Sequence, residues 1–153
     1  MEVCLRPCEP DDFDALYEID QACYPPGIAY SRRALRWFLR LPGAHCLAAL
    51  AGGKPIGFIL SEYERPRAHI ITLDVLAPYR RHHVGSNLLT TQEAWLAGHG
   101  VRRIELETAT DNLPAIAFWK KHGYRTCGVL KRYYLGRVDA YWMEKSLGPA
   151  QET

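Results

Sequence analysis

The segment between Ile70 and Gln92 constrains the fold of this chain more than any other. It opens with an apolar, β-branched run, breaks at Ala77-Pro78 and closes on a Leu-rich stretch, which predicts a strand, a turn and a helix. The first amides of a helix lack partners within the helix and carry the positive end of its dipole, so such a corner binds anions. The segment therefore predicts a phosphate site at the start of its helix.

The turn in this segment is rich in groups that suit a phosphate. It runs through Arg80, Arg81, His82 and His83 and enters the helix at Val84, Gly85 and Ser86. Arginine side chains donate paired hydrogen bonds to phosphates, and the glycine leaves no Cβ between the backbone and a ligand. We expect this corner to hold a pyrophosphate; the alternative is an ordinary strand-to-helix turn with solvated arginines.

The string from Arg80 to Gly85 resembles the acyl-CoA-binding motif (Q/R)xxGx(G/A) of the Gcn5-related N-acetyltransferase (GNAT) family. It departs from that motif once, because His83 stands at the first glycine. Histidine tolerates a left-handed backbone better than most residues, so it suits the position if the glycine serves for its backbone angle. If the glycine of the motif serves for close approach of the ligand, the pyrophosphate must lie farther from the backbone of the turn in this chain. The resemblance implies that acetyl-CoA is the cofactor and that residues 80–86 bind it.

A second stretch, from Asp111 to Tyr124, resembles the other signature of the family, N-x-x-A-x-x-F-Y-x-K-x-G-F. The resemblance implies cofactor contacts from Asn112, Ala115, Phe118, Trp119 and Lys121. Two other roles stay open, because Asn112 precedes a helix that it could cap and Phe118 is more simply explained by helix packing. Trp119 stands where many relatives have a tyrosine as general acid, and an indole N–H cannot deliver a proton.

The whole chain shows a mixed order of strands and helices. Apolar spacing and turn residues predict strands at 3–6, 45–50, 55–63, 70–76, 103–108, 126–130 and 140–145, and helices at 10–23, 32–41, 84–97 and 113–122. That order agrees with the GNAT fold, whose fourth and fifth strands splay apart to admit the pantetheine arm. We therefore expect an α/β (α+β) fold with a mixed sheet of about six to seven strands and about four flanking helices.

Length and composition limit the other possibilities. A chain of 153 residues predicts one domain, over residues 1–147, with a flexible tail at 148–153. The net charge of +2 is too small to indicate nucleic acid. No apolar run reaches the roughly 20 residues of a membrane span and the N-terminus lacks a signal peptide's apolar region, so we expect a cytoplasmic protein without a membrane partner. Five irregularly spaced cysteines indicate reduced thiols rather than a metal site.

The chemistry needs a base for the attacking amine. Glu107 is the candidate, acting through a water, because it lies at the end of a strand where the sheet should open; its alternative role is that of a solvated carboxylate like Glu105. The resemblance places the thioester carbonyl along Leu73, Asp74 and Val75, where the free amide of Val75 would stabilise negative charge on its oxygen. With an indole at position 119, Tyr133 is the favoured general acid. The alternatives are that Tyr134 supplies the proton, that the thiolate leaves unaided, or that the enzyme is weak.

Local features favour a peptide as the acceptor. The loop at Cys23-Tyr24-Pro25-Pro26 and the run Lys131-Arg132-Tyr133-Tyr134 resemble elements of the RimI-type protein N-terminal acetyltransferases, which makes Tyr24, Tyr30 and Tyr134 candidate acceptor contacts. An α-amine titrates near ~8, against ~10.4 for an alkyl amine, so a modest base suffices. The loop from Tyr24 to Tyr30 has no carboxylate for a polycation.

Three alternatives to this function stay open. The same transfer could go to a small amine such as a polyamine, an amino acid or an aminoglycoside. A module that binds acyl-CoA without useful turnover is another class, with His83 and Trp119 as marks of lost catalysis. Nucleic-acid binding through the basic residues is disfavoured, because few aromatic residues are interleaved with them. The oligomeric state is expected to be a monomer or a homodimer.

Overall fold

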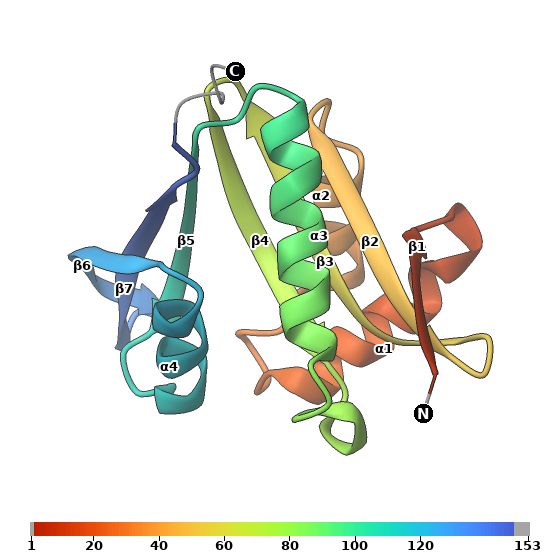
Figure 1. The fold of residues 1–153 in the computed structure, drawn as a ribbon. Helices are drawn as coiled ribbons and strands as arrows, with labels where there is room; N and C mark the ends of the chain where they lie inside the picture. The colour runs from red at the N-terminus through yellow and green to blue at the C-terminus, as the bar shows by residue number, and fades with distance from the viewer. Residues whose placement is uncertain (1, 149–153) are drawn as a thin grey trace.

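One seven-stranded mixed sheet organises the chain, in the spatial order β1-β2-β3-β4-β5-β7-β6 (Figure 1). A computed structural model describes residues 2–148. The strands are β1 (Val3–Pro7), β2 (Ala44–Ala51), β3 (Lys54–Glu64), β4 (Arg67–Val75), β5 (Arg103–Ala109), β6 (Arg125–Tyr134) and β7 (Val138–Ser146). Neighbouring strands are antiparallel except β4 and β5, which are parallel.

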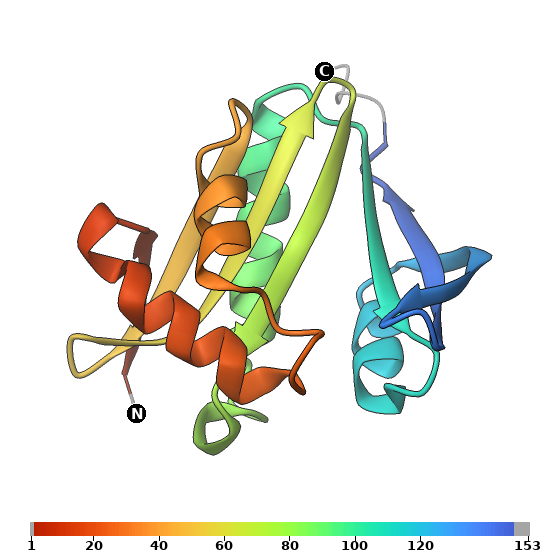
Figure 2. The same cartoon turned by 180° about the vertical axis from the view of Figure 1, so that it is seen from behind.

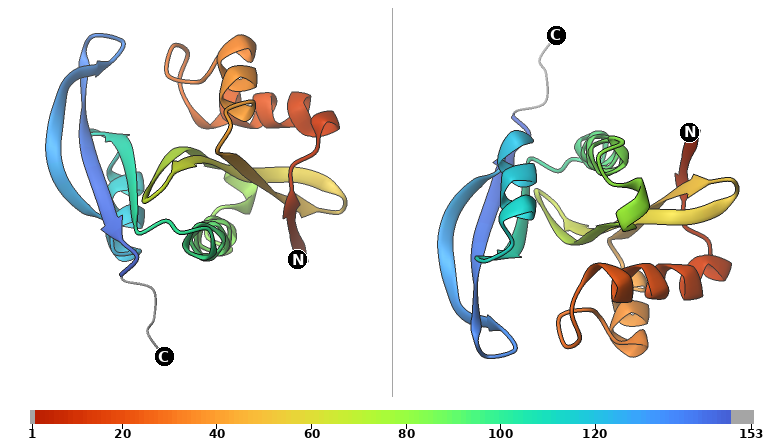
Figure 3. Two further views of the ribbon diagram at one scale, coloured as in Figure 1. Left: turned by 90° about the horizontal axis from the view of Figure 1, so that it is seen from above. Right: turned by 90° about the horizontal axis from the view of Figure 1, so that it is seen from below.

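Helices cover both faces of this sheet. They are α1 (Phe13–Cys23), α2 (Arg32–Leu39), α3 (Val84–Gly98) and α4 (Leu113–Lys121), with short 3-10 turns η1 (Pro10–Asp12) and η2 (Ala77–Tyr79). Figure 2 shows α1 and α2 in front of β2, β3 and β4, whereas α3 lies on the opposite face, as the two end-on views of Figure 3 also show. Within the described range, no helix has the length and apolar character that a membrane crossing requires.

The predicted fold class is confirmed, and the elements differ from prediction mainly at their ends. Ser31 caps α2, since its Oγ accepts the amide of Ala34 at 3.1 Å. The last two strands are longer than predicted, because the left-handed residues Leu135 and Gly136 make a turn tight enough for Tyr134 to pair with Val138. The predicted tail at 148–153 lies, beyond Gly148, outside the described residues.

Two apolar cores lie on the two faces of the sheet. On one face, Leu88, Leu89 and Leu96 of α3 are fully buried in a core that also takes in residues of β3, β4 and β5. On the other face, Leu16 of α1 and Leu35 of α2 pack with Phe58 and Leu60 of β3. Burial of each such side chain contributes about 1.5–3 kcal/mol, so both helical layers are held firmly against the central strands.

The central strands β4 and β5 pair only where they begin. Their register runs from Arg67 opposite Arg103 to His69 opposite Glu105, and it stops there, so the two strands part toward their carboxyl ends (Figure 2). The predicted splay between the fourth and fifth strands is confirmed. It leaves one edge of β4 without a neighbouring strand, and the side chains discussed below surround that opening.

A β-bulge in β4 decides which side chains face the opening. Leu60 pairs with Thr72 but Ser61 pairs with Ile70, so Ile71 is an extra residue in β4. A shift of one residue exchanges the two faces of a strand. As a result, Ile70 before the bulge and Val75 after it both contribute to the core beside α3, while Asp74 turns toward α1.

Candidate active site

The predicted phosphate corner has free backbone donors in the structure. None of the amides of residues 81–86 has a backbone acceptor within residues 2–148, and the first bond of the α3 turn is that from Asn87 to His83. His83 is the N-cap of α3 and adopts a left-handed conformation with φ of 62°, and Arg81 has φ of 66°. Histidine therefore stands at the first glycine of the motif because that position needs a left-handed backbone, which histidine tolerates.

The side chains of the corner divide into two groups. Arg81, His82 and His83 are exposed and available to a ligand. Arg80 instead turns back onto the end of β4, where its Nε donates to the carbonyl oxygen of Val75 at 2.8 Å. Its guanidinium also lies 3.6 Å from Sγ of Cys23. Arg80 thus fastens the turn to the strand, and a contact from its side chain to the cofactor remains a prediction.

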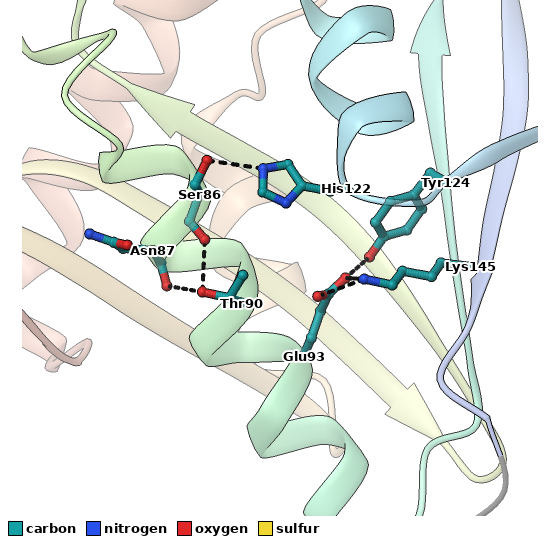
Figure 4. Close-up of polar contacts among 7 residues, drawn as sticks. All are labelled: Ser86, Asn87, Thr90, Glu93, His122, Tyr124 and Lys145. Carbon is teal, nitrogen blue, oxygen red and sulfur yellow. Dashed lines mark hydrogen bonds and ion pairs between the residues drawn. The ribbon is translucent and has the colours of Figure 1, made fainter.

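The start of α3 lies against α4, where the second motif was found. A Cβ at Gly85 would lie 3.5 Å from the ring of Phe118 and 3.8 Å from Cγ2 of Val75, so Gly85 brings α3 close to both sides of the opening. Phe118 packs there, as its packing role predicts. Ser86 Oγ and His122 Nε2 are 2.9 Å apart and form a second link between the two helices (Figure 4).

The other residues of the second motif have local roles in α4. Asn112 caps the helix, since its Oδ1 accepts the amide of Ala115 at 3.3 Å. Trp119 is only 8% exposed and packs against Tyr124, with ring centroids 5.3 Å apart. Lys121 is exposed in the last turn. The structure brings Ala115 and Phe118 near the opening, whereas Trp119 belongs to the core beside it.

A buried carboxylate that the sequence analysis missed joins α3 to the C-terminal strands. Glu93 is 8% exposed, accepts the hydroxyl of Tyr124 at 2.8 Å and lies 3.1 Å from Nζ of Lys145 (Figure 4). These contacts cross from α3 to the side of the opening formed by α4, β5 and β7. A partner for Glu93 was not recognisable in sequence, because Lys145 is 52 residues away along the chain.

The open edge of β4 is lined by groups from the end of α1 and the following loop. The carbonyl oxygens of Ile71 and Leu73 accept the hydroxyls of Tyr30 and Tyr24, each at 3.4 Å. The carbonyl oxygen of Val75 accepts Sγ–H of Cys23 at 3.5 Å. The predicted acceptor tyrosines Tyr24 and Tyr30 are thus placed along the opening, although sequence did not show that they bind the strand itself.

The amide of Val75 has the direction that its predicted role requires. The amide of the next residue, Leu76, bonds to the carbonyl oxygen of Ile56 on β3. Successive amides of a strand point to opposite edges, so the amide of Val75 points into the opening. This geometry allows it to donate to an oxygen atom lying between the two arms of the sheet.

Glu107 lies on the α1 side of the opening and is held by two partners. Its Oε1 is 2.7 Å from Nε2 of His69 and 3.4 Å from the hydroxyl of Tyr133. His69 was not among the expected site residues, because the predicted strand began at Ile70, whereas β4 begins at Arg67. The structure joins the predicted base to the predicted acid, and it adds a histidine that bonds to the base.

The charge of Glu107 changes the titration of its neighbours. Burial by itself lowers the pKa of His69, but the hydrogen bond and charge of Glu107 outweigh burial, and the pKa of His69 is raised above its usual value. Burial, and then the charge of Glu107, raise the pKa of Tyr133. Tyr133 therefore keeps its proton at neutral pH, as a general acid must.

The β6–β7 turn and the α1–α2 loop lie beside Glu107 and its partners on the predicted acceptor side. Tyr133 and Tyr134 of β6 form an edge-to-face pair with ring centroids 4.9 Å apart. The next residue, Leu135, is close enough to the α1–α2 loop that a Cβ on Gly27 would come within 2.5 Å of its Cδ2. Glycine suits position 27 because its φ of 89° lies in the left-handed region, which other residues rarely adopt. The predicted acceptor residues Tyr30 and Tyr134 therefore belong to neighbouring walls.

The residues present fit acetyl-CoA. Free amides and exposed cations at the start of α3 suit a pyrophosphate, and the opening between β4 and β5 leads from that corner to Glu107. A family model described as "Acetyltransferase (GNAT) family" matches residues 13–124. The chain belongs to the GNAT acetyltransferase family. Membership confirms the predicted enzyme class, an N-acetyltransferase, and the predicted cofactor, acetyl-CoA.

Named relatives agree with this membership. The chain is 26% identical to an N-alpha-acetyltransferase of Saccharolobus solfataricus, over 94% of this chain and 92% of the relative. It is 29% identical to the L-amino acid N-acetyltransferase AaaT of Escherichia coli, over 94% and 98%. In fold it matches the ribosomal-protein-S18-alanine N-acetyltransferase from Escherichia coli with a TM-score of 0.89 at 23% identity, covering 99% of this chain and 98% of the other. The predicted likeness to protein N-terminal acetyltransferases is confirmed.

Proposed function

We propose that this acetyltransferase moves the acetyl group of acetyl-CoA to the α-amine at the N-terminus of a peptide or protein. The single observation that supports this most is the placement of Glu107, bonded to His69 and Tyr133, at an opening flanked by two tyrosine-bearing turns. An extended chain end can enter between such turns. The similarity to a relative named N-alpha-acetyltransferase supports the same acceptor.

Glu107 is the residue that receives the proton of the amine, through a bridging water. An α-amine with a pKa near ~8 is close to ready at neutral pH, so a carboxylate is a sufficient base. His69 tunes this base, because a protonated imidazole at 2.7 Å lowers the basicity of the carboxylate more than a neutral imidazole does. The active form is therefore the one in which His69 has lost its proton.

The other groups orient the thioester and supply a proton. The amide of Val75 points into the opening and donates to the carbonyl oxygen on which negative charge develops, an interaction that can contribute roughly 3 kcal/mol. Tyr133 holds a proton beside Glu107 for the departing sulfur. The free amides at the start of α3, together with the exposed Arg81 and His83, bind the diphosphate and so fix the depth of the thioester.

A free amino acid is the second candidate acceptor, favoured by the similarity to AaaT. It would need a cation for its α-carboxylate near the opening. Lys131, the lysine of the β6 end, is 3.2 Å from Asp139, which also accepts the amide of Arg132. Because Lys131 is already paired, this candidate is second to a peptide.

A thiol-release assay with acetyl-CoA separates the candidates. The panel contains short peptides with free N-termini, the same peptides with acetylated N-termini and an internal lysine, free amino acids, and a polyamine. We expect release with free N-termini and none with blocked ones. Release with amino acids alone would favour the second candidate, and tight CoA binding without release above background would indicate a binding module.

A further inference from the structure

Two carboxyl groups lie buried beside the opening. Asp20 on α1 is 0% exposed, and Asp74, the residue before Val75 on β4, is 1% exposed. Their carboxyl groups lie within hydrogen-bonding reach of each other. One oxygen of each, Oδ1 of Asp20 and Oδ2 of Asp74, has no partner among the described residues. Two ionised carboxylates in such contact would repel strongly, so the pair is not stable when both carboxyl groups have lost their protons.

The remaining oxygen of each carboxyl group is already bonded. Oδ2 of Asp20 accepts the amide of Tyr30 at 2.7 Å, and Oδ1 of Asp74 accepts the hydroxyl of Thr72. A single proton on Oδ2 of Asp74, donated to Oδ1 of Asp20, satisfies both unpartnered atoms and removes the repulsion. No other change is needed to pair all four carboxyl oxygens.

Among residues 2–148, no cation bonds to the pair in place of this proton. The titratable groups that face it are Cys23 of α1, Tyr24 and Tyr30 of the loop, and Cys46 of β2. Burial raises the pKa of each of them, so all are neutral at pH 7. Arg80 of the turn after β4 directs its side-chain hydrogen bonds to Val75 and Cys23 instead. Burial, and then Asp20, also raise the pKa of Asp74 well above its usual range.

We propose that Asp20 and Asp74 share one proton, and that this pair positions the loop from Tyr24 to Tyr30 on the open edge of β4. Asp20 holds the amide of Tyr30, and Asp74 lies between Leu73 and Val75, whose carbonyl oxygens bond to Tyr24 and Cys23. Without the shared proton, the buried carboxylates would separate and carry the loop away from the strand. The link from this loop to acceptor binding rests on the proposed function.

The proton is tested by unfolding equilibria measured between pH 5 and pH 7. The native protein keeps a proton on Asp74 that the unfolded chain loses above about pH 3.9, so the native state binds more protons and stability falls as pH rises toward the raised pKa of Asp74. Asp74→Asn replaces the shared proton with an amide N–H. The unfolding constant of the wild type should rise about tenfold per pH unit relative to this variant.

The control is Asp11→Asn, the same chemical change at an exposed aspartate. It should keep the pH dependence of the wild type. An identical pH dependence in the wild type and in Asp74→Asn would overturn the shared proton. Infrared spectra provide a second measure, because a protonated carboxyl stretch should be present in the wild type and absent from Asp74→Asn.

Positioning is tested with Asp20→Ala, which removes the acceptor of the Tyr30 amide. Faster hydrogen exchange at the amide of Tyr30 is expected, and this readout does not require activity. With a peptide acceptor, KM for the peptide should rise roughly three- to tenfold, the loss of about one hydrogen bond, while KM for acetyl-CoA stays unchanged. Asp11→Asn, at an exposed aspartate away from the site, should leave both constants near those of the wild type.

The outcomes separate the two proposals. Unchanged exchange at Tyr30 in Asp20→Ala would overturn the positioning role whatever the acceptor is. Faster exchange without any peptide turnover in the wild type would keep the positioning role and remove the proposed acceptor. Equal rises in both Michaelis constants would show a general loosening of the fold, and would count against a role specific to the loop.

Discussion

The two sides of the opening between β4 and β5 are built in opposite ways. At the start of α3 the donors are left free: the amides of residues 81–86 have no backbone acceptor within the described chain, and Arg81 is exposed. On the acceptor side the polar groups bond to one another, as Glu107 does to His69 and Tyr133. A diphosphate needs free donors at a fixed corner, whereas proton transfer needs groups held at defined positions.

This difference teaches that the two sides should respond differently to substitution. Changes on the α3 side should appear in KM for acetyl-CoA, because its donors act on the ligand. Changes on the acceptor side should appear in turnover and in its pH dependence, because its groups act on each other and on the reacting amine.

The strongest test of this contrast is Glu107→Gln. Removing the base should lower kcat by about 10²–10⁴ while KM for acetyl-CoA stays near that of the wild type. Glu105→Gln is the matched control, because Glu105 lies on the same face of β5 two residues earlier. Steady-state kinetics with both substrates measure the effect. A pH–rate profile unchanged by Glu107→Gln would count against the assignment.

On the other side, His83→Val should raise KM for acetyl-CoA by about tenfold and leave kcat nearly unchanged. A β-branched residue in the left-handed region costs about 1–2 kcal/mol, and the turn would relax away from the geometry that aligns its amides. His83→Gly, which restores the residue of the motif, keeps the left-handed backbone and removes only the imidazole, so KM should rise less than in His83→Val, and the melting temperature should rise. If valine and glycine gave the same KM, the backbone angle of residue 83 would not matter for binding.

The pH dependence should depend on His69. Its pKa is raised by Glu107, so in the wild type kcat/KM rises with pH as His69 loses its proton, above the usual value of about 6.5. In His69→Gln the side chain still donates to Glu107 but does not titrate, so the rise of kcat/KM should move to lower pH. The stability that protonated His69 adds is present below about pH 6.5 and lost as pH rises through the raised pKa. If the rise of kcat/KM occurs at the same pH in His69→Gln as in the wild type, a group other than His69 causes it.

The smallest effect is expected for Trp119→Tyr. Many relatives have tyrosine at this position, but the ring at 119 is 8% exposed and packs against Phe118 and Tyr124. A phenol there would remain in the core, so kcat should change less than about threefold, and stability should fall by about 1–2 kcal/mol through lost packing. A tenfold gain in kcat would instead show that residue 119 reaches the reacting sulfur.

The α3 side could be predicted from sequence because its information is local. A strand, a turn and a helix within the 23 residues from Ile70 to Gln92 fix the free amides, and Gly85 and the basic residues occupy adjacent positions. The Asn112 cap could also be predicted, since it depends on Ala115, three residues away. The spacing of the helix predicted that Phe118 packs, but not that it packs beside Gly85 of α3.

Only part of the acceptor side could be predicted from the sequence. Glu107 and Tyr133 were chosen from their place at strand ends and from a family likeness, but His69, 38 residues before Glu107, was not. The face of the sheet on which each β4 side chain lies depends on the bulge at Ile71. The alternation of residues in the sequence does not show this one-residue shift of register. For the same reason, no feature of the sequence predicted that Asp74 lies against Asp20.

The sequence by itself determined the order of strands and helices, the corner of free amides at the start of α3 and the family to which the chain belongs, because helix starts, turns and apolar periods are set by residues near one another. Only the tertiary structure decided which distant side chains meet across the opening, and therefore which carboxyl groups share a partner or a proton. Those contacts depend on strand register and on the angle between β4 and β5, and both are set by the packing of the whole sheet rather than by any single segment.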